Sequence, residues 1–383
     1  MNRYASILPV LISFLICCIL YSCDPLTGPQ NDKFQVIKVD ITETQIEKEL
    51  VIKDVIPLET SDNCLIGYIK DVDLWNNRII ILDKHRSRSM FVFDTVGKLV
   101  SKTTLGKGPG EVVWPAAMSI NKRDSTISMW DQGQKSIVEF DLNCNFIDSK
   151  PYPNLFMMDF FPVGIDTLLV YNIQGFTNSK GEKRLTTYSL YTEDISRAKN
   201  LEIFLEENKG AYNLMSPVDI SSDQILFIAP LSYNICELID DTYRIKYALD
   251  FGNAAISSEQ WEKLSIDDLI SLVHHSYENK VGSLLSVYSN KHILMITAAY
   301  GDYGITIFYS FNDKKTYSLK NYIDHGLLPP CNVWGMKENG CIYAIVDAED
   351  FVRFNELTQR YDHLKITKND NPILITFQIE SLY

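Results

Sequence analysis

A glycine-rich segment, Gly106-Lys107-Gly108-Pro109-Gly110-Glu111, is the first place where residue types and spacing could do chemistry. Glycines let backbone amides approach an anion closely, so the segment could cradle a phosphate. A Walker loop, however, continues with Ser or Thr after the lysine and opens a helix, whereas Val112-Val113-Trp114-Pro115 follows here. We therefore expect a connecting loop. If this loop binds a ligand, we expect Lys107, Glu111 and Trp114 to reach the central mouth of a ring of blades.

Aromatic rings in loop-like settings could stack on a sugar ring. Trp114, Trp334 and Tyr300 are candidates, and so is Tyr303, which lies in the turn-like sequence Gly301-Asp302-Tyr303-Gly304. The chain has 5 Trp and 21 Tyr, and we expect most of these rings to pack between sheets. A ligand-binding role is therefore predicted only for Trp114 and Tyr303 among the aromatic residues, beside Lys107 and Glu111.

Motifs of the common catalytic and metal sites are absent from the sequence. His274 and His275 are adjacent, and neighbouring side chains on a helix or strand do not face one another, so they would not chelate one ion together. There is no His-Glu-x-x-His, Gly-x-Ser-x-Gly or Cys-x-x-Cys. The segment Asp71-Val72-Asp73 resembles the start of a calcium loop but continues as a strand pattern. We expect no catalytic residue, no metal and no cofactor.

Four aspartates recur in a repeated pattern. The runs that end at Asp83 and Asp94 return as runs that end at Asp131 and Asp141, after 48 and 47 positions respectively. A period of ~40 to 50 residues is typical of a four-stranded propeller blade. Each aspartate ends a predicted strand, where its carboxylate can bond to turn amides. We therefore expect these acids to support turns rather than to catalyse a reaction.

Weaker copies extend the pattern to six blades and predict an all-β, six-bladed β-propeller. Short β-branched and aromatic runs bounded by Asn, Asp and Gly favour such an array over alternating strands and helices. The copies after the second blade are expected at 168–172 with 185–191, at 225–228 with 233–238 and 243–249, at 292–297 with 304–311 and 315–319, and at 341–347 with 351–355 and 363–366.

Two further segments complete the predicted architecture. Residues 258–273 carry apolar side chains on one helical face, and Ser265-Ile266-Asp267-Asp268 resembles a capping box, so we expect a short helical insertion between blades four and five. An array of blades must close because open sheet edges would otherwise remain. Spare strands at 34–41, 50–58 and 372–379 suit that task, and one of them is expected to complete the sixth blade from the opposite terminus.

The N-terminus resembles a bacterial lipoprotein signal. Arg3 precedes an apolar run that ends in Leu20-Tyr21-Ser22-Cys23, a sequence similar to a lipobox. A transmembrane anchor would need ~20 apolar residues, and Pro9 interrupts this run. An ordinary signal peptide would have no need of Cys23. We predict a signal peptide over 1–22, lipidation of Cys23, a tether over 23–33 and one propeller domain over 34–383.

Charge and cysteine content limit the partners. The formal charge of −13 argues against a nucleic-acid surface, which needs clustered Lys and Arg. After removal of the signal and lipidation of Cys23, five scattered cysteines remain, and an odd number cannot all pair. We expect mostly buried free thiols at Cys64, Cys144, Cys236, Cys331 and Cys341.

Over most of its length the chain resembles six-bladed β-propeller lipoproteins of Gram-negative envelopes, which are related in fold to NHL and YWTD-type propellers. The resemblance is carried by Cys23, 57–60, 81–94, 106–111, 249–252 and 371–374. It implies a fold and an envelope location, anchored to the outer membrane on its periplasmic or surface side. It implies no catalytic residue.

Three functions follow as hypotheses. The first is a non-catalytic, monomeric binding protein that holds a carbohydrate or protein partner at one face of the propeller. The second is a glycan lyase or hydrolase whose site is assembled from several blades and so leaves no local motif. The third is a structural subunit of an envelope assembly.

Overall fold

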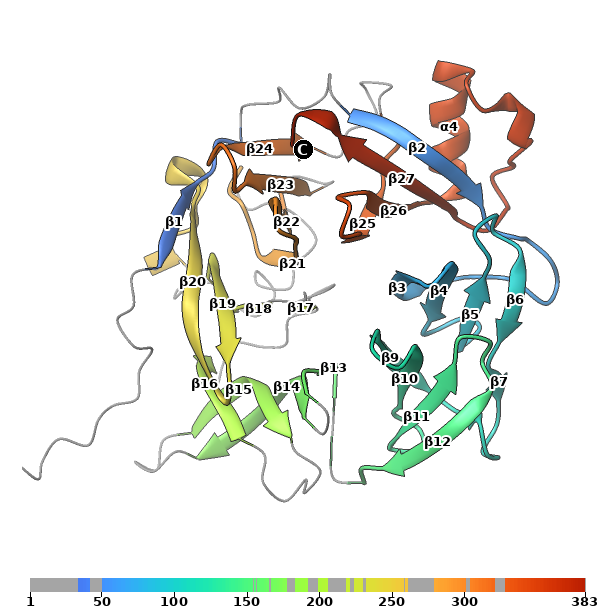
Figure 1. Ribbon diagram of the computed structural model, residues 1–383, viewed down its shortest axis with the longest axis horizontal. Helices are drawn as coiled ribbons and strands as arrows, with labels where there is room; N and C mark the ends of the chain where they lie inside the picture. Colours follow the sequence, from blue (N-terminus) through green and yellow to red (C-terminus); the bar gives the residue numbers. More distant parts are fainter. Residues whose placement is uncertain are drawn as a thin grey trace, which may run out of the picture. The chain divides into compact units, whose positions relative to one another are not determined.

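The computed structural model describes residues 34–41, 50–153, 155, 157–164, 167–177, 183–191, 199–205, 218–220, 224–229, 232–257, 259–260, 279–300, 304–320 and 328–382. Six antiparallel sheets are arranged radially as the blades of a β-propeller, which confirms the predicted fold class (Figure 1). Within the described part of the chain, no helix has the length and apolar character needed to cross a membrane.

Each blade begins with an inner strand at the axis and continues outward through consecutive antiparallel strands. Blades one and two comprise β3 (Ile69–Trp75), β4 (Arg78–Asp83), β5 (Ser89–Phe93) and β6 (Leu99–Lys102), then β9 (Pro115–Asn121), β10 (Thr126–Asp131), β11 (Ser136–Asp141) and β12 (Phe146–Pro151). Blades three and four comprise β13 (Asp159–Pro162), β14 (Leu168–Thr177), β15 (Lys183–Tyr191) and β16 (Lys199–Leu205), then β17 (Val218–Ile220), β18 (Ile225–Ile228), β19 (Asn234–Ile239) and β20 (Thr242–Asp250). Blade five comprises β21 (Leu284–Ser289), β22 (Ile293–Ala298), β23 (Ile305–Ser310) and β24 (Thr316–Lys320).

Blade six is built from both ends of the chain. Strands β25 (Asn332–Met336), β26 (Ile342–Val346) and β27 (Ile373–Ile379) come from the C-terminal region, and β2 (Leu50–Pro57) pairs antiparallel with β27 as the outer strand. Asn371 secures the closure because its Nδ2 donates to the carbonyl oxygens of Glu59 and Cys64, at 2.6 and 2.7 Å. The prediction that a terminal strand completes the ring is confirmed.

The segment β1 (Gln35–Lys38) has a place that the sequence did not indicate. It adds a fifth strand to blade four, parallel to β20, with Gln35 beside Tyr247 and Lys38 beside Asp250. The hydroxyls of Thr316 and Ser318 in blade five donate to the carbonyl oxygens of Lys38 and Asp40. The first described residues therefore span the outer edges of blades four and five.

Apolar side chains form the core between neighbouring blades. Strands bury alternate side chains on both faces, and one cluster joins Ile80 and Val92 of blade one to Met118 and Met129 of blade two. A second cluster joins blade six to blade one. The five cysteines outside the N-terminal segment are free, four of them buried and Cys144 half-buried, which confirms the expectation for their thiols.

The predicted strands at 351–355 and 363–366 are wrong. Residues 348–358 form helix α4 (Ala348–Thr358), and a 3-10 turn, η4 (Asp362–Leu364), follows it. Ala348, Phe351 and Phe354 are buried at helical spacing and pack on blade six. The third strand of this blade is β27 instead, because the helix lies between β26 and β27.

Most of the predicted helical insertion at 258–273 lies outside the described residues. Glu259 and Gln260 are helical. The capping pair is formed by Ser257 and Gln260, whose side chains accept each other's backbone N–H groups at 2.9 and 3.2 Å. The predicted capping box at 265–268 falls outside the described residues.

Candidate axial binding site

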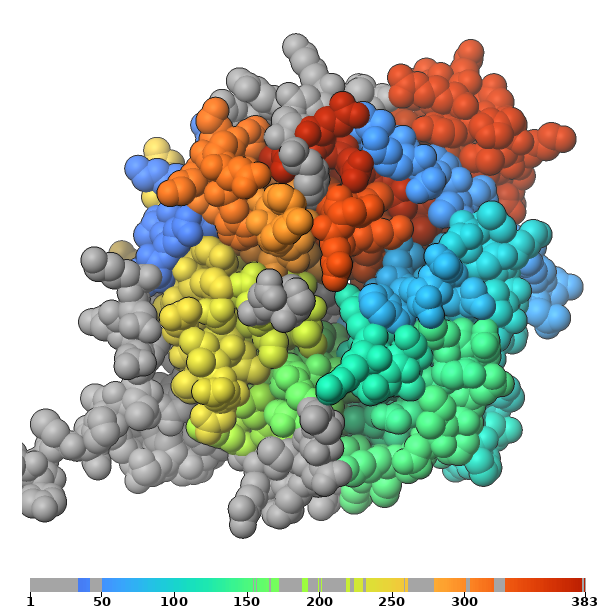
Figure 2. Space-filling view, in the orientation of Figure 1, coloured from blue at the N-terminus to red at the C-terminus, as the bar shows by residue number. Residues whose placement is uncertain are grey.

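A cavity of about 2110 Å³ lies along the axis of the propeller and is lined by residues from the inner strands of all six blades. Figure 2 shows the blades gathered around this axis. Turns that follow the last residues of inner strands also line the cavity: Asn76, Asn77, Lys122, Arg123, Asn290, Lys291, Lys337 and Glu338. These turns mark one end of the cavity as its rim. Residues near the start of the inner strands lie at the opposite, deeper end.

Four aspartates from the inner strands line the cavity: Asp71 and Asp73 of β3, Asp159 of β13 and Asp219 of β17. Successive side chains of a strand point to opposite faces, so Asp71 and Asp73 share a face of β3. Carboxylates are costly to bury without partners. Their contacts therefore decide what each of them can do.

The deepest of these acids are neutralised by one lysine. Lys70 is buried, and its Nζ lies 3.2 Å from Asp71 Oδ1 and 3.1 Å from Asp159 Oδ2. The contact between Lys70 and Asp159 links blade one to blade three. Burial alone would lower the pKa of Lys70, but Asp159 and Asp71 outweigh that effect and raise it, so the ammonium stays charged.

Asp73 has weaker support. Its Oδ1 accepts the backbone N–H of Leu74 at 2.7 Å and the hydroxyl of Tyr343 at 3.4 Å. Burial raises the pKa of Asp73, and the charge of Lys122 partly opposes this. Tyr343 reaches this position because Gly335 has no side chain, since a Cβ there would lie 2.1 Å from the tyrosine oxygen.

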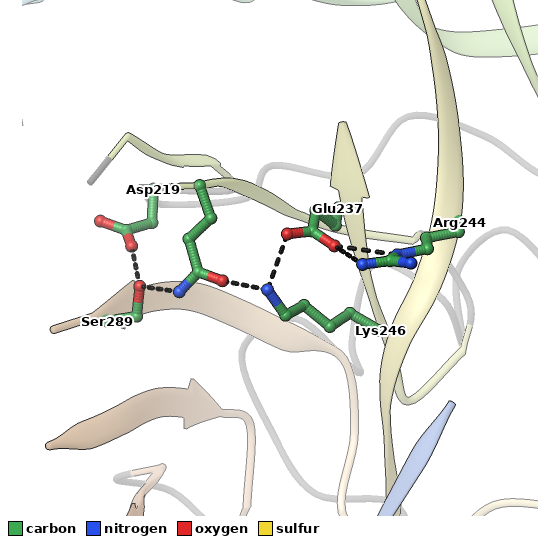
Figure 3. Close-up of polar contacts among 6 residues, drawn as sticks. Asp219, Glu237, Arg244, Lys246 and Ser289 are labelled. Atoms are coloured by element: carbon green, nitrogen blue, oxygen red, sulfur yellow. Dashed lines mark hydrogen bonds and ion pairs between the residues drawn. The ribbon is translucent and has the colours of Figure 1, made fainter. Parts of the chain in front are cut away.

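Asp219 bonds to Ser289 in blade five, whose hydroxyl lies at 2.5 Å and whose backbone N–H also donates to the carboxylate. Burial raises the pKa of Asp219 to about 6. A polar chain continues behind the serine: Gln224 donates to Ser289 Oγ at 3.1 Å, and Lys246 donates to both Gln224 and Glu237. Figure 3 shows Asp219 and Ser289 at one end of this chain and Lys246 and Glu237 at the other.

That chain ends on a strong ion pair at the outer part of blade four. Arg244 donates to Glu237 Oε2 at 2.8 and 2.9 Å, and Lys246 lies 2.7 Å from Glu237 Oε1. The two cations lower the pKa of Glu237, although burial acts in the opposite direction. The wall between blades four and five is therefore held in place behind Asp219.

Two tryptophans line the cavity. Trp75, at the end of β3, donates its indole N–H to Ser125 Oγ at 3.2 Å, and Lys122 Nζ lies 5.8 Å from its ring centroid. Trp334 of β25 is 8% exposed, and its indole N–H has no hydrogen-bond partner among the described residues. Aromatic faces beside carboxylates suit polar organic ligands that carry apolar or cationic faces.

Comparison with known proteins gives the family. The profile for DUF4934, a domain of unknown function, matches residues 36–378. The chain belongs to the DUF4934 family. Among curated proteins, none matches it.

Two solved structures share the fold of this DUF4934 chain. An exported protein from Bacteroides fragilis is 15% identical with a TM-score of 0.66, over 91% of this chain and 99% of that one. A member of the DUF4221 family from Bacteroides vulgatus is 12% identical with a TM-score of 0.56, over 86% of this chain and 98% of that one. At such identities the likeness shows the fold alone.

The loop predicted to bind a ligand lies at the other end of the blades from the rim. Lys107, Glu111 and Trp114 precede β9, and none of them lines the axial cavity. Lys107 is exposed, and Trp114 is 43% exposed. Glu111 folds back into its own loop, where Oε2 accepts the N–H of Gly108 at 2.7 Å. A binding role for this loop stays a prediction.

The other two predicted sites, the lipidation site Cys23 and the aromatic residue Tyr303, lie outside the described residues. The strand interpretation of Asp71-Val72-Asp73 is confirmed, since these residues lie in β3. In the described ranges, no cluster of three or more His, Cys, Asp or Glu residues could hold a metal ion.

The sequence did not single out the cavity acids Asp159 and Asp219. The only signal that could have found them is an acid within a predicted inner strand, where the side chain faces the axis. In blades three and four that signal was hidden, because their inner strands are only 4 and 3 residues long.

Proposed function

We propose that this protein is a lipid-anchored protein of the cell envelope that binds a small polar ligand in its axial cavity. The observation that carries the proposal is the cavity itself, which combines carboxylates, hydroxyls and tryptophan rings from all six blades in about 2110 Å³. Small-molecule sites are typically concave, with a few fixed polar groups among apolar and aromatic side chains.

The envelope location rests on two supports. The N-terminal sequence resembles a lipobox that ends at Cys23, and a structural neighbour from Bacteroides fragilis is described as exported. Several acyl chains on one cysteine would anchor the protein firmly, because each buried CH₂ contributes ~0.8 kcal/mol. The Cys23→Ala variant should lose palmitate labelling and leave the membrane fraction. Unchanged labelling would exclude this anchor.

The binding proposal is tested by a thermal-shift screen of glycans and metabolites on the full chain in detergent. A ligand present at 100 times its Kd stabilises a protein by ~2.7 kcal/mol, which the melting temperature reports. Trp75→Ala, in the cavity, should weaken binding of any hit, whereas Trp114→Ala, at the other end of the blades, should not. The reverse result would move the site to the loop over 106–114.

An enzyme is a second candidate, favoured by one observation. Burial raises the pKa of Asp219 to about 6, which is close to the value that suits a general acid or base near neutral pH. A glycan that binds should then be cleaved by the wild-type protein and not by Asp219→Asn. If the wild-type protein binds a glycan but does not cleave it, the enzyme hypothesis fails and the binding function remains.

A further inference from the structure

Charge is separated along the axial cavity. The inner strands contribute four acids, Asp71, Asp73, Asp159 and Asp219, and no base to the lining. The basic lining residues all come from turns or outer strands: Lys53, Arg78, Lys122, Arg123, Lys246, Lys291 and Lys337. At the rim, these bases are mixed with Asp54, Asp124 and Glu338. The deep part of the cavity is therefore acidic.

Only two of these four carboxylates lie beside a cation. Lys70 pairs with Asp71 and Asp159, as described above. Asp73 and Asp219 form no ion pair with any residue that the structure describes, and their partners are two backbone N–H groups, of Leu74 and Ser289, and two hydroxyls. Two carboxylates thus face a cavity without a cation in contact.

Lys122 is the cation whose charge acts on both Asp73 and Asp219. It belongs to the turn after β9, its side chain is exposed, and its ammonium lies over the ring of Trp75. An exposed lysine on a flexible stem is easily displaced. Lys122 therefore holds a position that favours a cation and that a ligand can take over.

Trp334 gives an independent indication of a ligand. Its side chain is more than nine-tenths buried in the cavity wall, and its indole N–H finds no acceptor in the described ranges. A buried donor without a partner is unfavourable, so native structures rarely keep one. A ligand oxygen at this wall would satisfy it.

Resting on the proposed function, we infer that the axial cavity selects a ligand with a primary ammonium group and hydroxyls, such as a free amino sugar. Asp73 and Asp219 bind the ammonium, and the Trp334 indole donates to a ligand oxygen. Charge-assisted hydrogen bonds are about twice as strong as neutral ones, and aromatic faces attract cations. Ligands with carboxylate or phosphate groups would be repelled by the same acids.

Three trisaccharides that differ at one substituent test the inference by calorimetry on the full chain in detergent. These probes are a β-1,4-glucosamine trimer, its N-acetylated form and a β-1,4-glucose trimer, which carry an ammonium, an acetamide and a hydroxyl at C2. The glucosamine trimer should bind at least about tenfold more tightly than the other two, the size expected for a hydrogen bond to a charged group.

Three variants sharpen the test. Asp73→Asn with Asp219→Asn should abolish the preference for the glucosamine trimer, while Asp148→Asn, on the exposed outer strand β12 and outside the cavity, should leave it unchanged. Lys122→Gln should strengthen binding of this trimer about threefold, because a competing cation is removed. A gain of affinity cannot result from damage to the fold. Trp334→Phe should weaken binding about fivefold through loss of one donor.

The outcomes separate the inference from the function on which it rests. Equal binding of the three trimers, or a loss of affinity in Lys122→Gln, overturns the ammonium assignment and leaves a binding protein for neutral sugars. Absence of binding to all three also overturns it. If the wider screen then finds no ligand sensitive to Trp75→Ala, the proposed function fails as well.

Discussion

Two groups of aspartates in this propeller lie on strands of its blades but differ in what surrounds their carboxylates. Asp83, at the end of β4, accepts five backbone N–H groups, at 2.8 to 3.3 Å. Asp219, on inner strand β17, accepts only the hydroxyl and the backbone N–H of Ser289 among the described residues. Burial acts to raise the pKa of both. The amides around Asp83 outweigh burial and lower its pKa, whereas the pKa of Asp219 rises to about 6.

The difference shows that the same residue type stabilises turns in one place and remains available to bind a ligand in another. Asp131 repeats the arrangement of Asp83 in blade two, because it accepts the N–H groups of Val113, Trp114, Gly133 and Gln134. These carboxylates tie the loop before an inner strand to the turn after the second strand. The oxygens of these strand-end carboxylates already accept several hydrogen bonds from the protein itself. The cavity acids Asp73 and Asp219 keep capacity for a ligand.

The largest effect is expected from removing a strand-end acid. Asp83→Ala would leave five amides without their acceptor and should cost about 4 kcal/mol of unfolding free energy. Asp94→Ala is the matched control, because its carboxylate bonds only the exposed amides of Val96 and Lys98, and it should cost about 1 kcal/mol. Urea denaturation at pH 7 measures both. Equal losses would remove the distinction between the two positions.

The contribution of Asp83 also depends on pH. Since its folded pKa lies below the ordinary value of 3.8, the stabilisation is complete above that value and is lost as pH falls through the folded pKa. Asp83→Ala should therefore remove part of the acid-induced loss of stability that the wild-type protein shows.

The buried ion pair gives the next effect. Lys70→Ala would leave Asp71 and Asp159 without their cation and should cost about 3 kcal/mol, as is usual when one partner of a buried pair is removed. Adding Asp159→Asn should recover part of that loss, because a neutral amide tolerates burial better. Urea denaturation of the single and the double variant measures how much of the lost stability Asp159→Asn recovers. A double variant less stable than Lys70→Ala would contradict the charge argument.

A smaller effect of opposite sign is expected at Asp219. The folded protein holds this proton up to about pH 6, whereas the unfolded chain releases it near 3.8. The native state therefore binds more protons between these values, and stability falls as pH rises through the window. Asp219→Asn should remove this dependence and gain about 1 kcal/mol at pH 7, less than the ~3 kcal/mol that the full pKa shift corresponds to, because a buried amide keeps part of the cost of burial.

Stability curves from pH 4 to 8 check this prediction, with Asp124→Asn at the rim as the control. The control should follow the wild-type curve, since the Asp124 side chain is exposed and bonds to Asn121. A loss of stability in Asp219→Asn at pH 7 would mean that the charged carboxylate stabilises the fold, as in the strand-end group.

The same contrast explains what the sequence could predict. The strand-end acids recur with the blade period, so Asp83 and Asp131 identified both the repeat and their own role at the turns. Closure of the ring by a terminal strand followed from the need to cover sheet edges, although the sequence left three strands open for that place and the structure assigns it to β2. Helix α4 was missed because Phe351 and Phe354 suit a buried strand as well as a helix, and short apolar runs do not separate the two.

The cavity acids could not be predicted in the same way. Asp73, Asp159 and Asp219 do not recur at the blade period, and they become neighbours only when the inner strands meet at the axis. The glycines and Trp114 in the loop over 106–114 gave a stronger local signal, yet Glu111 bonds to Gly108 of its own loop and the N–H of Trp114 donates to Asp131 at the end of β10. A local motif reports local bonding, whereas a propeller site depends on contacts between blades.

The smallest predicted effect concerns Asp73, the cavity acid with the weakest partner. Tyr343→Phe removes a hydroxyl that lies 3.4 Å from Asp73 Oδ1, near the limit of a hydrogen bond. It should cost about 0.5 kcal/mol in urea denaturation. Tyr317→Phe, which loses an exposed bond to Asp313, is the control and should cost less. A cost above about 2 kcal/mol would show that Asp73 is firmly held through Tyr343. Asp73 would then join the strand-end acids in its role, and Asp219 alone would remain to bind an ammonium group.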